Sequence, residues 1–336
     1  MKKLASLLLV LLMCFFALSS CGDKDEPEKT SDGTAVIRIG YMSGPTGIGM
    51  AKLINDNKGN DAKYTFTKFE DTTLAHTALL SGEIDAVCLP TNEAAKFYNT
   101  VNDELEVLAI NCLNSLQLLT GEGITLNSIE DLEGKTIYTC KNGTPKIILE
   151  KLLSAYGVNA TISHQIGSGD TALILNKPQD LPPIIVGNKA DIVLAPEPIV
   201  STALSKPQTK HKVSLDIGEL WDAKFSTPIA MGCIVINEEF ADNYEKEVNN
   251  FLIEYKKSIE YVSDPKNLET AAGYVVDAGI LADATVAKSA LTNLGDAIAY
   301  VDGREMKTTL VNIYNIFGMN VIGGRLPDDD FYHDGD

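Results

Sequence analysis

A glycine-rich turn between an apolar run and a helical pattern looks at first like a nucleotide-binding loop. It reads "IGYMSGPTGIGMAKLIN", residues 39–55. Backbone N–H groups at such a helix start favour anions or hydrogen-bonding ligands. Gly44 and Gly49 have the spacing of a phosphate-binding loop, but Met50 and Ala51 replace its lysine and hydroxyl residue. The dinucleotide pattern G-x-G-x-x-G fails as well. The turn therefore either contacts a non-nucleotide ligand or only links a strand to a helix.

Side chains that do covalent or metal chemistry form no recognisable set. The four histidines are scattered, with no H-x-x-x-H spacing and no nucleophile–base signature, and no C-x-x-C pair occurs. Four cysteines lie in or end apolar strand-like runs, so they are expected to be buried free thiols, although an exported protein can pair some of them: Cys88, Cys112, Cys140 and Cys233. We predict no metal, no cofactor and no enzymatic activity.

The N-terminus has the pattern of an export signal. Lys2 and Lys3 precede the apolar run Leu7–Leu18, and small residues follow. The sequence up to Cys21 resembles a bacterial lipobox, which predicts a lipid-modified Cys21 after cleavage; an ordinary signal peptide with a chance cysteine is the alternative. Residues 21–34 are polar and aperiodic, as in a flexible tether. No later stretch is long and apolar enough to cross a bilayer. We expect an extracytoplasmic protein anchored to the membrane by lipid.

Charge and length restrict the class of partner. Two of the 28 basic residues leave with the signal, so 26 face 46 acidic ones and the net charge falls from −18 to −20. Such a field repels nucleic acid and anionic lipid, so neither is an expected partner. The chain without its signal is long enough for two domains or lobes.

Short apolar runs alternate with helical patterns from residue 36 onward. A βαβα order predicts an α/β fold with an open, mostly parallel sheet between helices. The strands expected in the first unit are Val36–Met42, Tyr64–Phe69, Ile84–Leu89 and Val107–Cys112, and the helices are Gly47–Asn55, Leu74–Leu80 and Asn92–Tyr98.

A second unit begins at "NSIEDLEGKTIYTC" and contains a helix in "KNGTPKIILEKLLSAYG". The proline-rich segment 176–189 is expected to be a surface loop. The strands expected here are Lys135–Cys140, Thr161–Ile166, Ile192–Leu194 and Val213–Ile217.

The chain returns to strand at Ile229–Ile236 and ends in helical patterns. An apolar stripe at spacings of three and four runs from residue 244 to 262. Further helices are expected at 267–279, 284–299 and 304–317. This end either forms a separate domain or, more economically, packs on the first unit. Crossings near 114–126 and 225–230 would then form a hinge, which divides the chain into a signal (1–20), a tether (21–34), lobe one (35–122 and 229–336) and lobe two (123–228).

Four segments in order resemble one family. They read "ALLSGEIDAVCLPTNEAAKFYN", "SIEDLEGKTIYTCKNGTP", "KADIVLAPEPIVSTAL" and "GGRLPDDDFY". They are similar to extracytoplasmic solute-binding proteins of ABC importers, in the NMT1-like group for nitrate, sulfonate, taurine and thiamin precursors. The resemblance covers about residues 36–332. It implies a two-lobed type II periplasmic-binding-protein fold, a small-molecule solute in the cleft between the lobes, a membrane permease as partner, and a monomer.

The expected ligand contacts follow strand ends, because open α/β sheets bind ligands at the carboxyl ends of their strands. Several have a plain structural alternative: a helix cap for Thr91 or Asn92, a hinge-stabilising or exposed acid for Glu197, and core packing for Tyr41 and its counterpart Tyr138. The candidate residues are Tyr41, Ser43, Gly44, Pro45, Thr46, Thr91, Asn92, Asn114, Ser115, Asn142, Gly143, Thr144 and Glu197.

The solute is expected to be uncharged or cationic, and an anion held by backbone N–H groups alone, with Lys141 nearby, is the alternative. Only Arg38, Arg304 and Arg325 occur, and none lies in an expected cleft loop, which disfavours a guanidinium clamp on a carboxylate. Two other roles use the same cleft. One is an extracytoplasmic sensor. The other is a thiamin-pyrimidine-synthase-like enzyme, disfavoured by the export signal and by the missing cysteine-rich motif.

Overall fold

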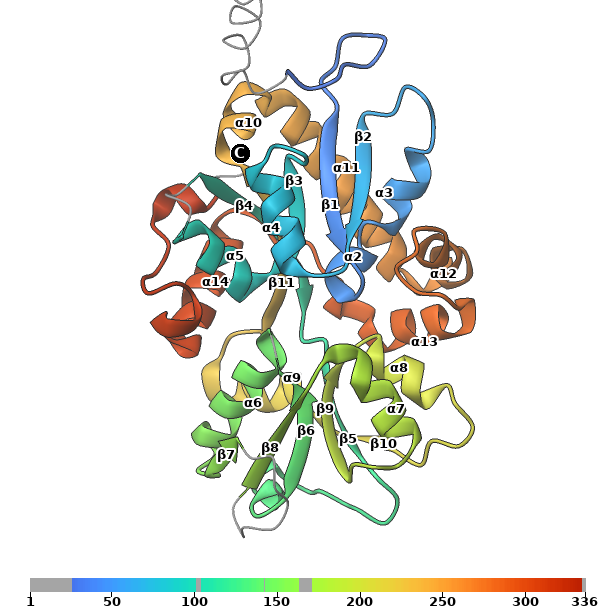
Figure 1. Cartoon of the computed structure of the whole chain (residues 1–336), viewed down its shortest axis with the longest axis vertical. Coiled ribbons are helices and arrows are strands. Elements are labelled where there is room, and N and C mark those ends of the chain that lie inside the picture. The colour runs from blue at the N-terminus through green and yellow to red at the C-terminus, as the bar shows by residue number, and fades with distance from the viewer. Residues whose placement is uncertain (1–25, 101–103, 142, 163–170, 334–336) are drawn as a thin grey trace, which may run out of the picture.

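The chain forms two α/β halves stacked along its long axis (Figure 1). The computed structural model describes residues 26–100, 104–141, 143–162 and 171–333. The export signal and Cys21 lie outside this range, as does Asn142. We call the half with the five-stranded sheet lobe one and the half with the six-stranded sheet lobe two. The two-lobed α/β fold expected from the sequence is confirmed.

The sheet of lobe one has the order β2-β1-β3-β11-β4. Strands β1, β2 and β3 run parallel, while β11 runs antiparallel to both of its neighbours. The strands are β1 (Ile37–Met42), β2 (Tyr64–Phe69), β3 (Ala86–Pro90), β4 (Leu105–Leu113) and β11 (Ala230–Asn237).

The sheet of lobe two has the order β10-β5-β9-β6-β8-β7. Here β5 is the reversed strand, antiparallel to β9 and β10. The strands are β5 (Leu116–Thr120), β6 (Thr136–Cys140), β7 (Ala160–Ile162), β8 (Thr171–Asn176), β9 (Ile192–Pro196) and β10 (Lys212–Asp216). In both sheets the reversed strand is the one that the chain enters from the other lobe.

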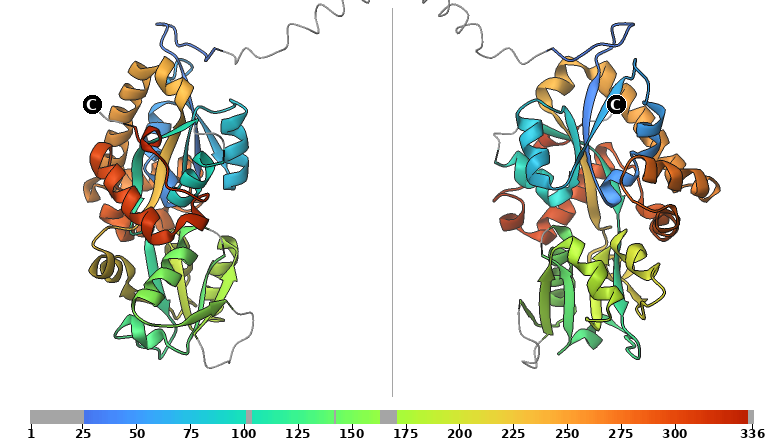
Figure 2. Two further views of the ribbon diagram at one scale, coloured as in Figure 1. Left: turned by 90° about the vertical axis from the view of Figure 1, so that its left-hand side faces the viewer. Right: turned by 45° about the vertical axis from the view of Figure 1, so that its right-hand side comes forward.

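The helices cover both sheets (Figures 1 and 2). Lobe one contains α2 (Pro45–Ile48), α3 (Ala51–Asp56), α4 (Thr72–Leu80) and α5 (Thr91–Tyr98), and lobe two contains α6 (Thr144–Ala155), α7 (Leu181–Val186), α8 (Ile199–Leu204) and α9 (Ile217–Phe225). The C-terminal helices are α10 (Glu238–Asn243), α11 (Glu245–Ser263), α12 (Leu268–Asp277), α13 (Ala284–Leu294) and α14 (Gly303–Phe317). Short 3-10 turns lie at Ile129–Leu132, Pro178–Asp180, Pro265–Asn267, Gly295–Ala297, Met319–Val321 and Asp329–Phe331.

The C-terminal helices pack on lobe one, as the more economical prediction has it. Helices α11 and α12 both contact α3. The predicted stripe of α11 is its buried face and contains Val248, Phe251, Tyr255, Ile259 and Val262. Burying one side chain of this size stabilises the fold by roughly 1.5–3 kcal/mol. Helices α13 and α14 also reach lobe two, where they contact α8 and α6.

The four described cysteines are free and buried, as expected. Burial raises the pKa of Cys88, Cys112 and Cys140 to about 12, so these thiols are unreactive. No helix in the described ranges is long and apolar enough to span a membrane.

Three details differ from the prediction. The first crossing is shorter than expected, because Asn114 and Ser115 alone separate β4 from β5, and the predicted boundary at residue 122 lies after β5. The segment predicted as a loop contains α7, whose prolines occupy the first turn, where a missing N–H costs nothing. Strands β5 and β8 were not predicted, and the predicted strand Thr161–Ile166 lies partly outside the described residues, which show it as β7 up to Ile162.

Candidate functional site

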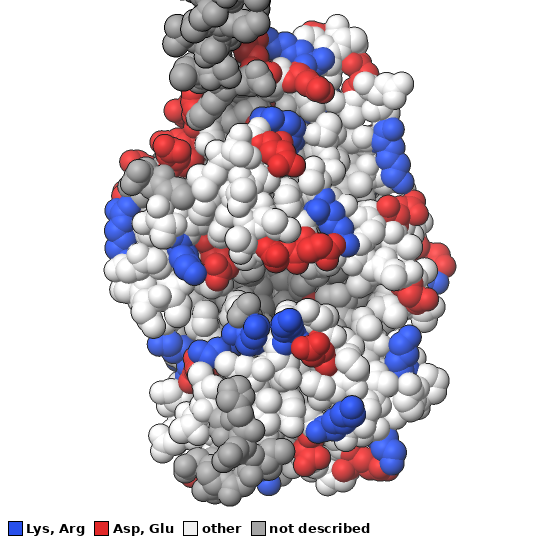
Figure 3. Space-filling model, in the orientation of Figure 1, with Lys and Arg blue, Asp and Glu red and all other residues white. Residues whose placement is uncertain are grey.

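The carboxyl ends of the parallel strands of the two lobes face each other across a groove. Helix α2, which follows β1, lies at the lower end of lobe one, and helices α6 and α8 begin at the upper end of lobe two (Figure 1). Figure 3 shows the hollow between the halves, with basic side chains prominent on its lower lip and acidic ones on its upper lip. The edges that the sequence predicts to bind ligand therefore share one groove.

The turn after β1 contains the buried Gly44, with open space where a Cβ atom of that residue would lie. Gly44 has φ 118° and ψ −169°, a conformation that only glycine adopts readily. A Cβ atom at Gly44 would meet no atom within 4 Å. No side chain caps α2, Ser43 is exposed, and Pro45 is in the first turn. Asn111 fixes this turn from below by donating Nδ2 to the carbonyl of Thr46 at 3.2 Å.

The turn after β6 repeats this conformation in lobe two. Gly143 has φ 79° and ψ −167°, no side chain caps α6, and Pro145 lies in the first turn. The next residue, Thr144, is buried. Because β6 pairs with β9 in parallel, this turn lies beside the one that contains Glu197. The predicted contact Asn142 lies outside the described residues.

The turn after β3 is tied to the second crossing. Thr91 donates its hydroxyl to the carbonyl of Ala230 at 2.7 Å, and Tyr314 donates to the carbonyl of Thr91 at 3.1 Å. Asn92 donates Nδ2 to Glu93 at 3.1 Å, while its buried Oδ1 has no partner in the described part of the chain. The helix-cap alternative does not apply, because the N-cap of α5 is Pro90 and no side chain caps the helix.

The two crossings are bonded to each other. Asn114, at φ 41°, accepts a hydrogen bond from the N–H of Ile229 on Oδ1 at 2.9 Å and donates its own N–H to the carbonyl of Ile229 at 3.0 Å. The carbonyl of Ser115 accepts from the N–H of Glu197 at 3.0 Å. The buried hydroxyl of Ser115 has no partner among the described residues. Asn114 therefore acts on the hinge.

Glu197 uses both carboxylate oxygens inside the protein. It is 1% exposed. Its Oε2 accepts from the N–H of Ser201 at 3.0 Å, and its Oε1 accepts from Nδ2 of Asn293 at 2.8 Å. Burial raises the pKa of Glu197, although the hydrogen bonds from Asn293 and Ser201 act in the opposite direction. This arrangement matches the hinge-stabilising alternative rather than an open ligand contact.

The two tyrosines at strand ends pack into the protein. Tyr41 is 7% exposed and donates its hydroxyl to the carbonyl of Ala278 at 2.8 Å. Tyr138 is half-buried against the lobe-two core that contains Leu119 and Val193. The core-packing alternative describes both positions.

Four residues that organise this edge were not predicted. Asn111 and Gly232 lie under the Thr46 turn, and Ser201 and Asn293 surround Glu197. Asn111 had a signal, because it is a polar residue inside the otherwise apolar run "LAINCL". The other three had none, since an exposed helical asparagine such as Asn293 is common on any protein surface.

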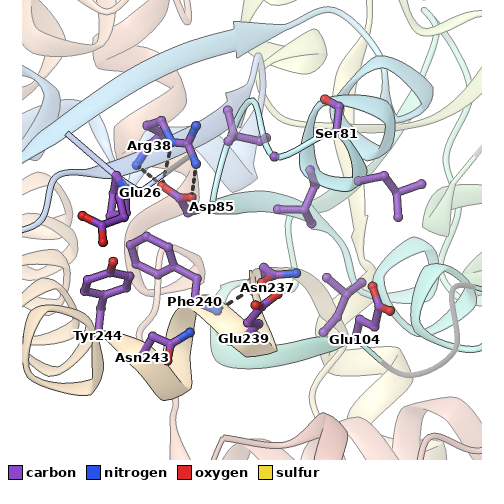
Figure 4. A pocket seen from close by; sticks show the side chains of 16 residues that line it. Glu26, Arg38, Ser81, Asp85, Glu104, Asn237, Glu239, Phe240, Asn243 and Tyr244 are labelled. Carbon is purple, nitrogen blue, oxygen red and sulfur yellow. Dashed lines mark hydrogen bonds and ion pairs between the residues drawn. The ribbon is translucent and has the colours of Figure 1, made fainter. Parts of the chain in front are cut away.

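A second cavity, of about 470 Å³, lies at the opposite, amino-terminal edge of the lobe-one sheet (Figure 4). Arg38 binds Asp85 in it, with Nη2–Oδ1 at 2.5 Å and Nε–Oδ2 at 3.0 Å. None of the predicted ligand contacts lines this cavity. Arg38 therefore lies at the far end of β1, away from the expected cleft loops.

Comparison with known proteins agrees with this architecture. The family model described as NMT1/THI5 like matches residues 106–267. An ABC transporter structure from Parabacteroides distasonis has a TM-score of 0.73 at 20% identity, covering 90% of this chain and 99% of that one. The periplasmic aliphatic sulphonate-binding protein of Escherichia coli has a TM-score of 0.69 at 15% identity, with coverages of 89% and 92%. The chain has the fold of the periplasmic solute-binding proteins.

A more distant match supports the same fold. The periplasmic nitrate-binding protein of Synechocystis PCC 6803 has a TM-score of 0.55 at 14% identity and covers 81% of this chain and 70% of that one. No curated protein matches the chain in sequence. The resemblance inferred from four sequence segments is therefore confirmed by the family model over residues 106–267 and by the solute-binding-protein fold over most of the chain.

Proposed function

We propose that this protein is the solute-binding component of an ABC importer. It captures a small organic molecule between its lobes and delivers it to a membrane permease. The observation that carries this function is the pair of uncapped glycine turns, at Gly44 and Gly143, at the facing edges of two sheets. Backbone N–H groups at these helix starts are available to a ligand, and closure around it needs only a hinge motion.

The proposed solute is an organic molecule that binds by hydrogen bonds rather than through an arginine clamp. Arg38 is engaged by Asp85 at the other end of the sheet, and the carboxylate of Glu197 is engaged by Ser201 and Asn293. Near the strand ends, the buried Oδ1 of Asn92 and the buried hydroxyl of Ser115 have no partner among the described residues. An uncharged solute with N–H or O–H donors can form hydrogen bonds with such acceptors. A site built in this way rejects analogues that lack those donors.

We propose that the protein acts by binding and has no turnover. The described residues contain no group of three or more His, Cys, Asp or Glu side chains placed to hold a metal ion. Their four cysteines are buried and carry raised pKa values, so they are poor nucleophiles. We further propose that Cys21 carries lipid, that the protein is extracytoplasmic and that it is a monomer.

Native mass spectrometry of freshly purified protein tests this function, followed by calorimetry with a panel of uncharged, cationic and anionic solutes. We expect a retained small molecule and a dissociation constant in the micromolar range or below. Gly44→Ala should weaken binding, whereas Gly59→Ala, an exposed position with space for a Cβ atom, should not. Catalysed consumption of any solute would overturn the proposal, as would the absence of binding across the panel.

A further inference from the structure

Asn293 connects the two lobes at the edge of the groove. It lies in α13, which packs on α12, and α12 packs on α3 of lobe one. Its side chain crosses to lobe two, where Nδ2 donates to Oε1 of Glu197 at 2.8 Å and lies 3.1 Å from Oγ of Ser201. Helices α13 and α8 lie side by side at this junction (Figure 1).

The acceptor on lobe two, Glu197, is held in place by bonds that do not involve Asn293. The N–H of Glu197 bonds to the carbonyl of Ser115 at the first crossing, and its Oε2 accepts from the N–H of Ser201 in the first turn of α8. These bonds lie within lobe two and its junction with the hinge. Of the hydrogen bonds made by Glu197, a motion that separates the lobes therefore breaks only the one from Asn293.

The bond is made where water is excluded from the acceptor. Glu197 is 1% exposed, so its carboxylate depends on protein donors. A hydrogen bond to a buried charged group is stronger than one between neutral groups, and removing its donor leaves part of the charge unsatisfied. Loss of Asn293 therefore destabilises the arrangement in which the two lobes meet at Glu197, whereas separated lobes would let water solvate its carboxylate.

We propose that Asn293 is a positioning residue that holds the lobes closed through Glu197. This inference rests on the proposed function for its purpose: the apparent affinity for solute scales with the fraction of protein in the binding-competent form. Neither side chain needs to touch the solute. The triad Glu197–Ser201–Asn293 sets the open–closed balance on which the groove depends.

The experiment measures the distance between the lobes of the full-length protein by electron–electron double resonance, without solute. Nitroxides are attached through Leu74→Cys on α4 and Lys177→Cys after β8, both exposed positions, while the described native thiols are buried. Samples that carry each label alone correct for background. Asn293→Ala, Asn293→Asp and Thr292→Ala are then compared with the unsubstituted parent. Thr292 is the matched control, because it is exposed on the same helix and, among the described residues, its hydroxyl bonds only the carbonyl of Lys288.

We expect Asn293→Ala to raise the ratio of long to short distances about tenfold or more. Asn293→Asp should raise it further, because it places a second carboxylate against Glu197. Thr292→Ala should leave the distribution unchanged. If both Asn293 variants give the distribution of Thr292→Ala, the proposal is wrong. The measurement contains no solute, so its outcome is independent of whether calorimetry detects binding.

Discussion

Two turns at the facing edges of the lobes contain a proline next to a candidate ligand contact, yet the structure uses them in opposite ways. Gly44–Pro45 in lobe one has no side-chain cap and open space in front of its Cα atom. In lobe two, Pro196–Glu197–Pro198 surrounds a carboxylate that is 1% exposed and bonded on both oxygens. In the first turn no side chain caps the backbone N–H groups, and we propose that they bind the solute. In the second turn, both carboxylate oxygens of Glu197 already accept hydrogen bonds from the protein.

The difference shows that a position at a strand end does not by itself leave a group free to bind a ligand. Open α/β sheets place ligand groups at strand ends, and that rule selects both turns equally. Whether a group at a strand end can bind a ligand depends on whether other protein groups already form hydrogen bonds with it. For Glu197 the neighbour is Asn293, 96 residues away along the chain. Availability is therefore a tertiary property.

The test with the largest expected effect fills the space beneath the turn that contains Thr46. A Cβ atom on Gly232 would lie 2.3 Å from Cγ2 of Thr46 and 2.6 Å from Oδ1 of Asn111. Gly232→Ala must therefore displace the Thr46 turn, and we expect a loss of about 1–3 kcal/mol in the free energy of unfolding together with loss of solute binding. Chemical denaturation and calorimetry measure the two effects.

The matched control for Gly232→Ala is Gly273→Ala in α12, where a Cβ atom would meet nothing within 4 Å. That change should stabilise the protein by up to about 1 kcal/mol, because alanine favours helix. Unchanged solute binding in Gly232→Ala would show that the Thr46 turn plays no part in the site.

The second test strains the open turn without filling it. Gly44→Ala forces alanine into φ 118°, at an expected cost of about 1–3 kcal/mol, although no atom obstructs its methyl group. Gly143→Ala should behave alike, because its φ of 79° is also positive. If calorimetry shows that either variant binds solute as tightly as the parent, the corresponding turn does not contact it.

Most of the fold was accessible from the sequence, and the exceptions have local causes. The stripe of α11 and the strand at residues 64–69 were predicted closely because their periodicity is uninterrupted. Strand β5 was missed because Asn114 adopts a left-handed conformation between two strands, and a polar pair there resembles a loop. Helix α7 was missed because two prolines in its first turn look like helix breakers.

The candidate site was only partly accessible from the sequence. The glycine turns were predictable because positive φ and a following helix leave a local signature. The long-range contacts that decide which candidate residues are free to bind a ligand were not predictable from the sequence. Gly232 under Thr46 and Asn293 on Glu197 each join segments far apart in sequence, and nothing in either segment alone indicates the other.

The third test concerns the hinge that both turns share. Asn114→Ala removes the acceptor for the N–H of Ile229 and puts alanine at φ 41°. We expect a loss of about 1–2 kcal/mol in stability. Asn114→Gly relieves the strain but not the lost bond, so its thermal midpoint should fall between those of the parent and the alanine variant. Equal midpoints for all three proteins would mean that the crossings are held together by their backbones alone.

The smallest expected effect is the pH dependence of the closed turn. Burial raises the pKa of Glu197 above its ordinary value of 4.5, so the folded state holds that proton to a higher pH than the unfolded chain does. The contribution of Glu197 to stability is therefore fully present below pH 4.5 and is lost as the pH rises through the raised pKa. Glu197→Gln does not titrate, so the stability of the parent relative to this variant should fall as the pH rises from 4 to 7. Denaturation midpoints at several pH values measure this difference, with Glu133→Gln, at an exposed carboxylate, as the control. A difference between parent and variant that stays flat with pH would mean that water reaches Glu197, and the contrast between an open turn and a closed one would then not hold.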